Sequence, residues 1–536
     1  MNVAFDPWIP VVSASGEPLR ASLEEVFTEG REFADLAVRP HERVSLMRLF
    51  LCVAHAALGG PGDYDEWCEV PNKLSGAAHT YLTNWKDSFE LFHPEKPWLQ
   101  VGELRAAGDS GRHSPVSLLD FELATGHSST LYDHGGLMGA RRIEPERVAL
   151  TLLTFQNFAP GGGCPVAQWK TTRTAQVGNP DAPCISQSMA HCMLRGKSLG
   201  ETIHLNLPCF DTIKRVYGDS STDGKKPGIL NGANLGRPVW EFFPESPNNG
   251  SDRVVNATRT YIGRLTPISR WVRLIEGSDQ MYCCNGFKYD TYKDGFIPEP
   301  TAAVRLVTKK DKKGTNATER RVVSANPQRA IWRELSSLLI KPAAEGLGGP
   351  IAMENAPHES EFDFHVCAIT RDQASMDIAV ESVFHIRPAF QANLSFYEAE
   401  VVVAESYSRR LRAAVEEYRQ EVDRDWRPRV ERTQPRDRSA LIDRLAGSAF
   451  LSYWTTVEKN LPLLMDHIEA IGTDAANPTK DAWRKMLRGA AYEAYRIACG
   501  QETPRQLRAF AKGWQKLTAA RQESQVGSNE KEGKEA

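Results

Sequence analysis

Apolar residues recur every three or four positions in the last third of the chain, which is the spacing of one face of an α-helix. The runs with this pattern are 404–422, 439–457, 483–494 and a last one that carries Leu507, Phe510, Trp514 and Leu517. Thr503 and Pro504 are suitable as the N-cap and first residue of the last helix. Four helices with short connections predict a four-helix bundle over 393–520, and the polar residues 521–536 are expected to be disordered.

The N-terminal part of the chain mixes extended and helical patterns. Prolines at positions 7 and 10 exclude a helix and predict an extended opening segment over 6–12. Ser22 and Glu25 have the spacing of a capping box, which predicts a short helix. Pro40 precedes a run that is apolar nearly all round, so we expect a buried helix there, followed by a stop at Gly59.

The middle of the chain alternates short strands with loops. Strand candidates at 303–307 and 321–323 flank a charged stretch, 308–320, which is expected to be a solvated turn, and a helix is expected over 329–339. Together with the helical C-terminal region, this pattern predicts an α+β fold. A large mixed domain would cover 1–392, and the bundle would follow it.

The composition indicates a soluble protein. The 536 residues have a formal net charge of -3, and 41% of them are hydrophobic, which suffices for a sizeable core. No run approaches the roughly 18 apolar residues of a membrane span, and the N-terminus lacks the basic and apolar regions of a signal peptide, so we expect a cytoplasmic protein without membrane contact. A near-neutral charge argues against a free-standing, tight, non-specific nucleic-acid binder, but not against a protein that shares its nucleic acid with partners.

Motifs of the common enzyme classes are absent from the sequence. It contains no GxxxxGK[ST], HExxH, GxSxG or strand-associated GxGxxG pattern. Cys164, Cys184 and His191 are the best candidates for metal chemistry, but their spacing matches no zinc pattern. The adjacent Cys283 and Cys284 cannot form the CxxC half of a tetrahedral site. We therefore expect no metal and no cofactor, and a metal-dependent hydrolase at the first cluster is the alternative.

Several short loop elements follow one another in a distinctive order. They are the opening FDPWIPV, Pro97-Trp98-Leu99-Gln100, the glycine run Gly161-Gly162-Gly163, Lys288 among aromatic residues, and Arg371 to Ser375 with its Gln-Ala-Ser. Taken together with the C-terminal helices, they resemble the CasA family, the large subunit of the type I-E CRISPR surveillance complex (Cascade). The likeness covers nearly the whole chain, and its specificity comes from the order of the elements.

This resemblance implies a subunit without catalytic activity, placed near the 5′ end of the CRISPR RNA. Such a subunit reads the protospacer-adjacent motif (PAM) in double-stranded target DNA, starts unwinding and recruits the effector helicase-nuclease. Its other partners would be the CRISPR RNA and the 5′-handle-binding, backbone and small subunits of the complex. A scaffold subunit that does not read DNA is a further alternative.

The resemblance also assigns roles to individual residues. Gly161, Gly162 and Gly163 would lie along the PAM minor groove, and Lys288 would reach into it. Gln373 would insert as a wedge beside the PAM, flanked by Asp372 and Ala374. The residues expected to contact the CRISPR RNA end and neighbouring subunits are Leu131, Tyr132, Asp133 and His134.

The chain departs from the family pattern at two points. Asp372 stands where a relative has an amide, and a carboxylate accepts hydrogen bonds but does not donate them. The PAM preference at this contact therefore stays open. Some relatives carry two cysteine pairs suggestive of zinc, whereas residues 131–142 contain no cysteine here. This difference adds to the expectation that no metal is bound.

Overall fold

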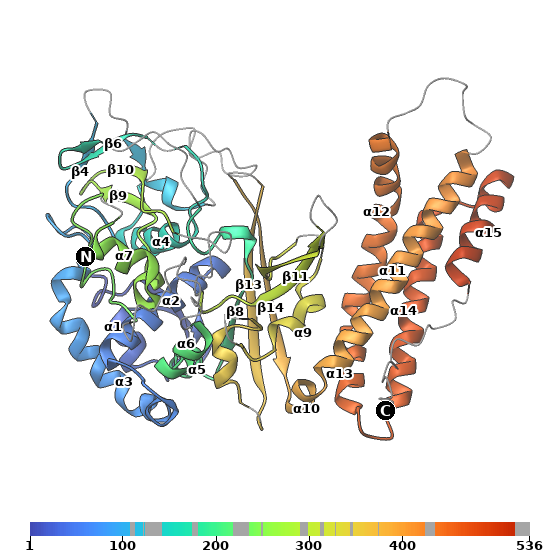
Figure 1. Ribbon diagram of the computed structural model, residues 1–536, viewed down its shortest axis with the longest axis horizontal. Helices are drawn as coiled ribbons and strands as arrows, with labels where there is room; N and C mark the ends of the chain where they lie inside the picture. The colour runs from blue at the N-terminus through green and yellow to red at the C-terminus, as the bar shows by residue number, and fades with distance from the viewer. Residues whose placement is uncertain are drawn as a thin grey trace, which may run out of the picture. The chain divides into compact units, whose positions relative to one another are not determined.

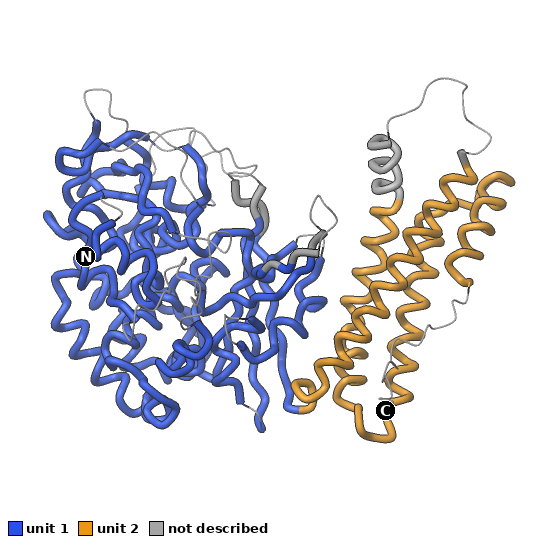
Figure 2. Tube along the Cα trace, viewed as in Figure 1, with its two compact units in different colours: residues 1–388 blue, residues 389–536 orange. Residues whose placement is uncertain are grey.

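The protein consists of two compact units, residues 1–388 and 389–536, in a computed structural model (Figure 2). The structure describes residues 1–107, 113–121, 123, 142–163, 165–173, 181–217, 235–247, 250–289, 299–310, 316–326, 329–343, 347–357, 359–372, 375–423 and 435–519. The first unit mixes helices and strands and the second is helical, which confirms the predicted fold class. The division falls four residues before the predicted boundary at 392. Among the described residues, no helix is long and apolar enough to span a membrane.

The first unit begins with a small antiparallel sheet and three helices (Figure 1). These elements are β1 (Ile9–Ser13), β2 (Pro18–Ala21), α1 (Leu23–Thr28), β3 (Phe33–Leu36), α2 (Pro40–Leu58) and α3 (Tyr64–Asn84). The capping box of Ser22 and Glu25 starts α1 as predicted, and α2 runs from Pro40 until Gly59 adopts a left-handed conformation. Residues on every side of α2 are buried, so this helix forms the centre of the unit's core.

Two further three-stranded sheets share the unit with short helices. Their elements are β4 (Leu104–Ala106), β5 (Ser114–Pro115), η2 (Val116–Leu119), α4 (Pro145–Phe158), β6 (Ala167–Trp169), β7 (Thr172–Arg173), α5 (Leu199–Asn206), α6 (Phe210–Tyr217), α7 (Asp252–Arg259), α8 (Tyr261–Leu265), β9 (Arg270–Leu274) and β10 (Gln280–Asn285). The strand orders are β4-β6-β7 and β5-β10-β9. In Figure 1 the labelled strands of these sheets, β4, β6, β9 and β10, lie above α4 in the view.

Two hairpins complete the unit: β11 (Val304–Lys310) with β12 (Asn316–Val322), and β13 (Phe362–Asp372) with β14 (Ser375–Ile386). The predicted turn over 308–320 was too long, because backbone pairing continues through its charged residues as far as Lys310 and Asn316. The expected helix over 329–339 is a 3₁₀ turn, Ile331–Glu334, followed by the short α9 (Leu335–Leu338). β13 also pairs with β8 (His191–Arg195).

The second unit contains the predicted helices. They are α10 (Pro388–Ala392), α11 (Leu394–Asp423), α12 (Pro435–Lys459), α13 (Leu461–Ala470), α14 (Ala476–Ala498) and α15 (Pro504–Thr518). The four long helices surround a core that includes Leu411, Tyr453, Trp483 and Tyr495, and Thr503 caps α15 as predicted. Residues 520–536 lie outside the described residues, so the predicted disorder of the tail stays a prediction.

Candidate nucleic-acid interface

The glycine loop begins where α4 ends, and buried contacts hold its first residues. The carbonyl oxygens of Ala159 and Pro160 accept hydrogen bonds of 3.2 and 2.7 Å from one guanidinium nitrogen of Arg270. The next amide, that of Gly161, donates to Asp181 at 2.9 Å. The entry to the loop is therefore fixed on two sides.

Gly163, at the end of the loop, is exposed. A Cβ added to this residue would have no atom of the described residues within 4 Å, its chain neighbours apart. Packing against the described part of the protein therefore gives no reason for a glycine here. A glycine at such a position lets the backbone approach an external ligand more closely than any other residue would.

Gln156 locks the last turn of α4 to the start of β9. Its side chain is buried, accepts from the amide of Arg270 at 2.9 Å and donates to the carbonyl of Arg270 at 2.8 Å. Its own carbonyl accepts from the Ser269 hydroxyl at 2.7 Å. Because both polar ends of a buried amide are satisfied by one residue, the helix end and the strand are held in a fixed relation.

Lys288 lies just after the end of β10, and the segment around it is also attached to the start of β9. Phe287 donates through its amide to Ile268 at 3.3 Å, and the Tyr289 hydroxyl accepts from the Ile268 amide at 2.7 Å. Phe287 and Tyr289 are buried, so the residue between them is directed outward and is exposed. Lys288 itself is not part of β10, which ends at Asn285.

Arg270 thus connects two of the predicted elements. Its guanidinium holds the carbonyl before Gly161, and its backbone pairs with Asn285, three residues before Lys288. The structure brings the glycine loop and the Lys288 segment to residues 268–270, at and just before the start of β9. Sequence reasoning missed Arg270 and Gln156, although a glutamine within the apolar run LLTFQNF of α4 was a signal of a buried polar contact.

The predicted wedge belongs to the turn of the hairpin β13–β14. The last pair of that hairpin joins Asp372 to Ser375, and β8 pairs with β13 only as far as Cys367, so the turn end has no third strand among the described residues. The prediction of a polar loop over 371–375 was wrong in extent, because strand pairing reaches Asp372. Gln373 and Ala374 lie outside the described residues, and so does the Asp372 side chain.

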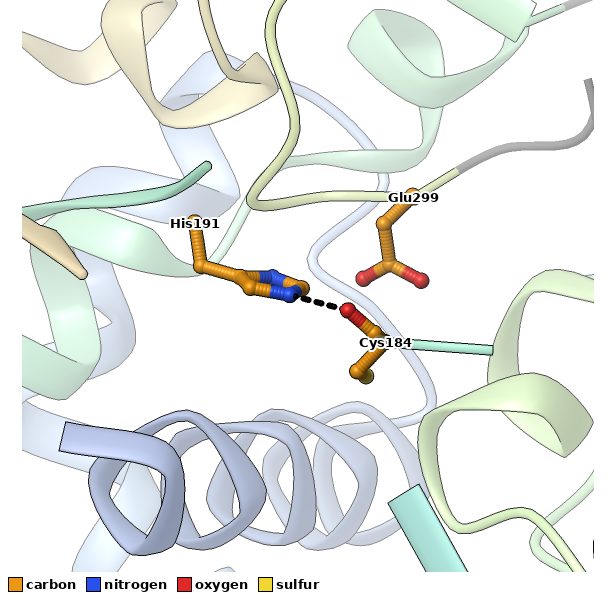
Figure 3. Close-up of side chains that lie close together, drawn as sticks. All are labelled: Cys184, His191 and Glu299. Atoms are coloured by element: carbon orange, nitrogen blue, oxygen red, sulfur yellow. Dashed lines mark hydrogen bonds between the residues drawn. The ribbon is translucent and has the colours of Figure 1, made fainter. Parts of the chain in front are cut away.

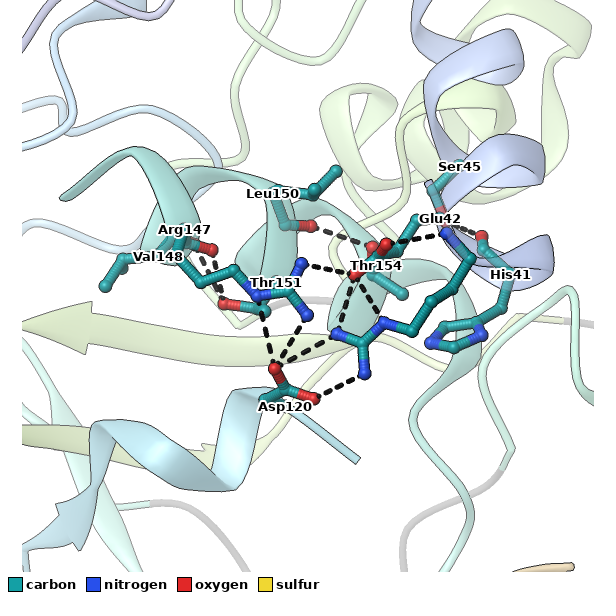
Figure 4. A network of polar contacts seen from close by, with 10 residues as sticks. His41, Glu42, Ser45, Asp120, Arg147, Val148, Leu150, Thr151 and Thr154 are labelled. Carbon is teal, nitrogen blue, oxygen red and sulfur yellow. Dashed lines mark hydrogen bonds and ion pairs between the residues drawn. The ribbon is translucent and has the colours of Figure 1, made fainter. Parts of the chain in front are cut away.

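The predicted RNA-contact residues 131–134 also lie outside the described residues, but an ion-pair network lies on both sides of them in the sequence (Figure 4). Asp120 contacts Arg39 at 3.0 Å and Arg147 at 2.7 Å, and Glu42 contacts the same two arginines at 2.7 Å each. Burial raises the pKa of Glu42, and the positive charge of Arg39 opposes this rise. The network links η2, before the segment, to α4, after it.

The candidate metal cluster turns out to be a buried polar network (Figure 3). Cys184, His191 and Glu299 have their potential ligand atoms within 4.8 Å of one another, and Cys164 lies outside the described residues. Glu299, however, forms an ion pair with the buried guanidinium of Arg48.

Both ring nitrogens of His191 are already engaged. Nε2 donates to the Cys184 carbonyl at 2.9 Å, and Nδ1 lies 2.7 Å from the Thr301 hydroxyl, which donates to it in this tautomer. Burial lowers the pKa of His191 to about 4 and raises the pKa of the Cys184 thiol, so both side chains are neutral. A divalent cation would need a thiolate and would add charge beside Arg48, so these residues do not fit a metal.

Comparisons with known proteins all lead to one family. The model of the family described as CRISPR-associated protein Cse1 matches residues 2–494. A curated relative, CRISPR-associated protein CasA/Cse1 of Thermus thermophilus, is 28% identical over 96% of both chains.

Solved structures show the same fold. A crystal structure of Thermus thermophilus CasA matches 96% of this chain and 98% of its own, with a TM-score of 0.69 and 23% identity. A crystal structure of Thermobifida fusca Cse1 matches 96% of this chain and 98% of its own, with a TM-score of 0.68 and 20% identity. A chain from a CRISPR RNA-guided surveillance complex matches 97% of this chain and 99% of its own, with a TM-score of 0.71 and 18% identity.

Proposed function

Because the chain belongs to the CRISPR-associated protein Cse1 family, we propose that it is the large subunit of a type I-E CRISPR surveillance complex and recognises the PAM of target DNA. In this role it carries no catalytic activity of its own. It holds duplex DNA at the PAM, starts strand separation for pairing with the CRISPR RNA, and recruits the helicase-nuclease that degrades the target.

The joint attachment of the glycine loop and the Lys288 segment to β9 is the observation that carries this proposal. The minor groove of B-DNA is about 6 Å wide, so a backbone without side chains enters it more easily than bulky residues do. A Cβ at Gly163 would meet none of the described residues beyond its chain neighbours, and Lys288 is exposed close to the same strand. The backbone of the glycine loop would thus fit the narrow groove, and Lys288 would provide a single hydrogen-bond donor.

Recognition of this kind is expected to be tolerant. A lysine can donate to the N3 or O2 acceptors of the minor groove, but these acceptors do not distinguish A·T from T·A. Several PAM variants would therefore bind. Insertion of Gln373 at the neighbouring base step would cost a few kcal/mol of unstacking, and growing RNA–DNA pairing would offset it without nucleotide hydrolysis.

The test uses the protein reconstituted with the other subunits and a CRISPR RNA. Binding and opening of matched duplexes that carry a PAM library are measured for the wild type, Lys288→Ala and Gln373→Ala, with Lys73→Ala, an exposed lysine of α3, as the charge-matched control. We expect enrichment of a few PAMs, a loss of affinity with Lys288→Ala and a loss of opening with Gln373→Ala. Binding that is independent of the PAM and unchanged in both variants would leave a scaffold role instead.

A further inference from the structure

The small sheet β4-β6-β7 aligns two arginines and a glutamine across its three strands. Arg105 of β4 is the register partner of Gln168 in β6, and Gln168 is in turn the partner of Arg173 in β7. Directly paired residues of an antiparallel sheet extend to the same face. The three side chains therefore form one polar row across the sheet.

The opposite face of this sheet is buried at Leu104 of β4 and at Ala167 and Trp169 of β6, which places the polar row on the outside. Trp169, next to Gln168, packs against Trp271 and Phe287 with ring centroids 4.9 and 6.2 Å away. Since successive residues of a strand alternate between faces, Gln168 and its two partners are on the solvent side. Arg105 and Arg173 are accordingly exposed.

The charges of the two arginines are not compensated by any acidic residue in the part of the chain that the structure describes. Among the described residues, neither Arg105 nor Arg173 has an ion-pair partner, whereas Lys170 in the turn between β6 and β7 is paired with Glu103 at 3.2 Å. Two strand spacings place the arginine backbones about 10 Å apart. Like charges fixed at this separation favour an anionic ligand, and the guanidinium fork matches the oxygens of a phosphate.

The polar row also lies next to the glycine loop and the Lys288 segment, the two elements proposed to contact the PAM. β6 begins four residues after Gly163, and the ring of Trp169 packs on that of Phe287, the residue before Lys288. A duplex with its minor groove at these elements would extend past the sheet. Its phosphates would then come close to the two arginines, which have no ion-pair partner among the described residues.

We propose that Arg105, Gln168 and Arg173 bind the sugar–phosphate backbone of the duplex DNA that flanks the PAM. This inference rests on the proposed function, because it assumes that duplex DNA lies at the glycine loop. The arginines supply charge and Gln168 supplies a neutral hydrogen-bonding group between them. Contacts to phosphates position a duplex without reading its sequence.

The salt dependence of DNA binding tests this inference. Each phosphate contact contributes about 0.9 to the slope of log K against log salt concentration, so the reconstituted complex with Arg105→Ala/Arg173→Ala should show a slope shallower by about 1.8. Its affinity should fall for every duplex while its ranking of PAMs stays as in the wild type. The control is Arg20→Ala/Arg31→Ala, which removes two exposed arginines of the same unit.

A slope equal to that of the control would overturn the inference, provided that thermal unfolding shows both double variants to be folded. An equal loss of affinity for the CRISPR RNA in the absence of DNA would also overturn it, because the row would then bind RNA. A different result would contradict the proposed function itself, because the wild type would then show no PAM preference. Comparing the wild-type PAM ranking with the variant's slope separates the two.

Discussion

The guanidinium of Arg270 donates a hydrogen bond of 2.7 Å to the carbonyl oxygen of Pro160, the residue before the glycine loop. The same side chain also donates to the carbonyls of Ser269 and Ala159, and it is buried. Arg270 is therefore a positioning residue: it need not touch a ligand in order to set where Gly161 begins.

Replacing Arg270 should weaken both the fold and the loop geometry. In Arg270→Met the carbonyls lose a buried donor, which should lower the free energy of unfolding by about 1–3 kcal/mol. Amide hydrogen exchange at residues 161–163 should become faster. Arg273→Met, on the same strand, is the matched control and should change neither quantity. Unchanged exchange at the glycine loop in Arg270→Met would show that Arg270 does not hold it.

Gly163→Ala should weaken DNA binding without lowering the stability of the protein. The added methyl meets no atom of the described residues within 4 Å apart from its chain neighbours, so the free energy of unfolding should change by less than about 1 kcal/mol. If the backbone enters the minor groove there, duplex binding should nevertheless fall at least several-fold. Gly286→Ala is the opposite case, because its Cβ would lie 2.3 Å from the Ser269 backbone and should lower the melting temperature strongly. Unchanged DNA binding in Gly163→Ala would contradict the groove contact.

The protein should lose stability as the pH falls from about 6.5 to 4. Burial lowers the pKa of His55 and of His191 from 6.5 to about 4, so both stay neutral in the folded protein while the unfolded chain takes up protons. Each neutral histidine contributes on the order of 3 kcal/mol to the free energy of unfolding. This contribution is fully present above pH 6.5 and is lost progressively as the pH falls to 4. Calorimetric melting temperatures across this range measure it. A flat profile would mean that the rings are accessible to protons.

Removal of divalent metal ions by a chelator should leave the thermal stability of the protein unchanged. Arg48 already neutralises Glu299, and both nitrogens of His191 are bonded, so the cluster should not retain a divalent ion. We expect the same melting temperature with EDTA and with added zinc, and elemental analysis should find far less than one metal per chain. Stoichiometric zinc that is lost in Cys184→Ser would contradict this and revive the hydrolase alternative.

Asp120→Asn should reveal the coupling within the network of Figure 4. The change preserves the shape but removes a charge that faces Arg39 and Arg147, so we expect a loss of about 1–2 kcal/mol in the free energy of unfolding. A double-mutant cycle of Asp120→Asn with Arg147→Met should show a coupling of at least about 0.5 kcal/mol. Additive effects would mean that the ion pair contributes little.

Local signals in the sequence were sufficient for many elements. The capping box at Ser22, the N-cap at Thr503 and the proline at position 40 start helices as predicted, because a cap or a fixed φ acts within one turn of backbone. The periodicity of the C-terminal region likewise predicted its long helices, since each helix needs a continuous apolar face. The strand ends were less predictable, because charged residues such as Lys309 and Lys310 pair through their backbone whatever their side chains.

The sequence by itself determined the capped helices α1, α2 and α15, the long helices of the C-terminal unit, the mixed fold class and, by resemblance, the order of the loop elements. Only the tertiary structure decided how these elements meet: that Arg270 joins the glycine loop to the Lys288 segment, and that Glu299 reaches Cys184 and His191 together with a neutralising Arg48. The reason is physical. Capping and periodicity act over a few residues, whereas a buried hydrogen bond or ion pair depends on which distant segments the packing brings within about 3 Å, and that distance is a property of the whole fold.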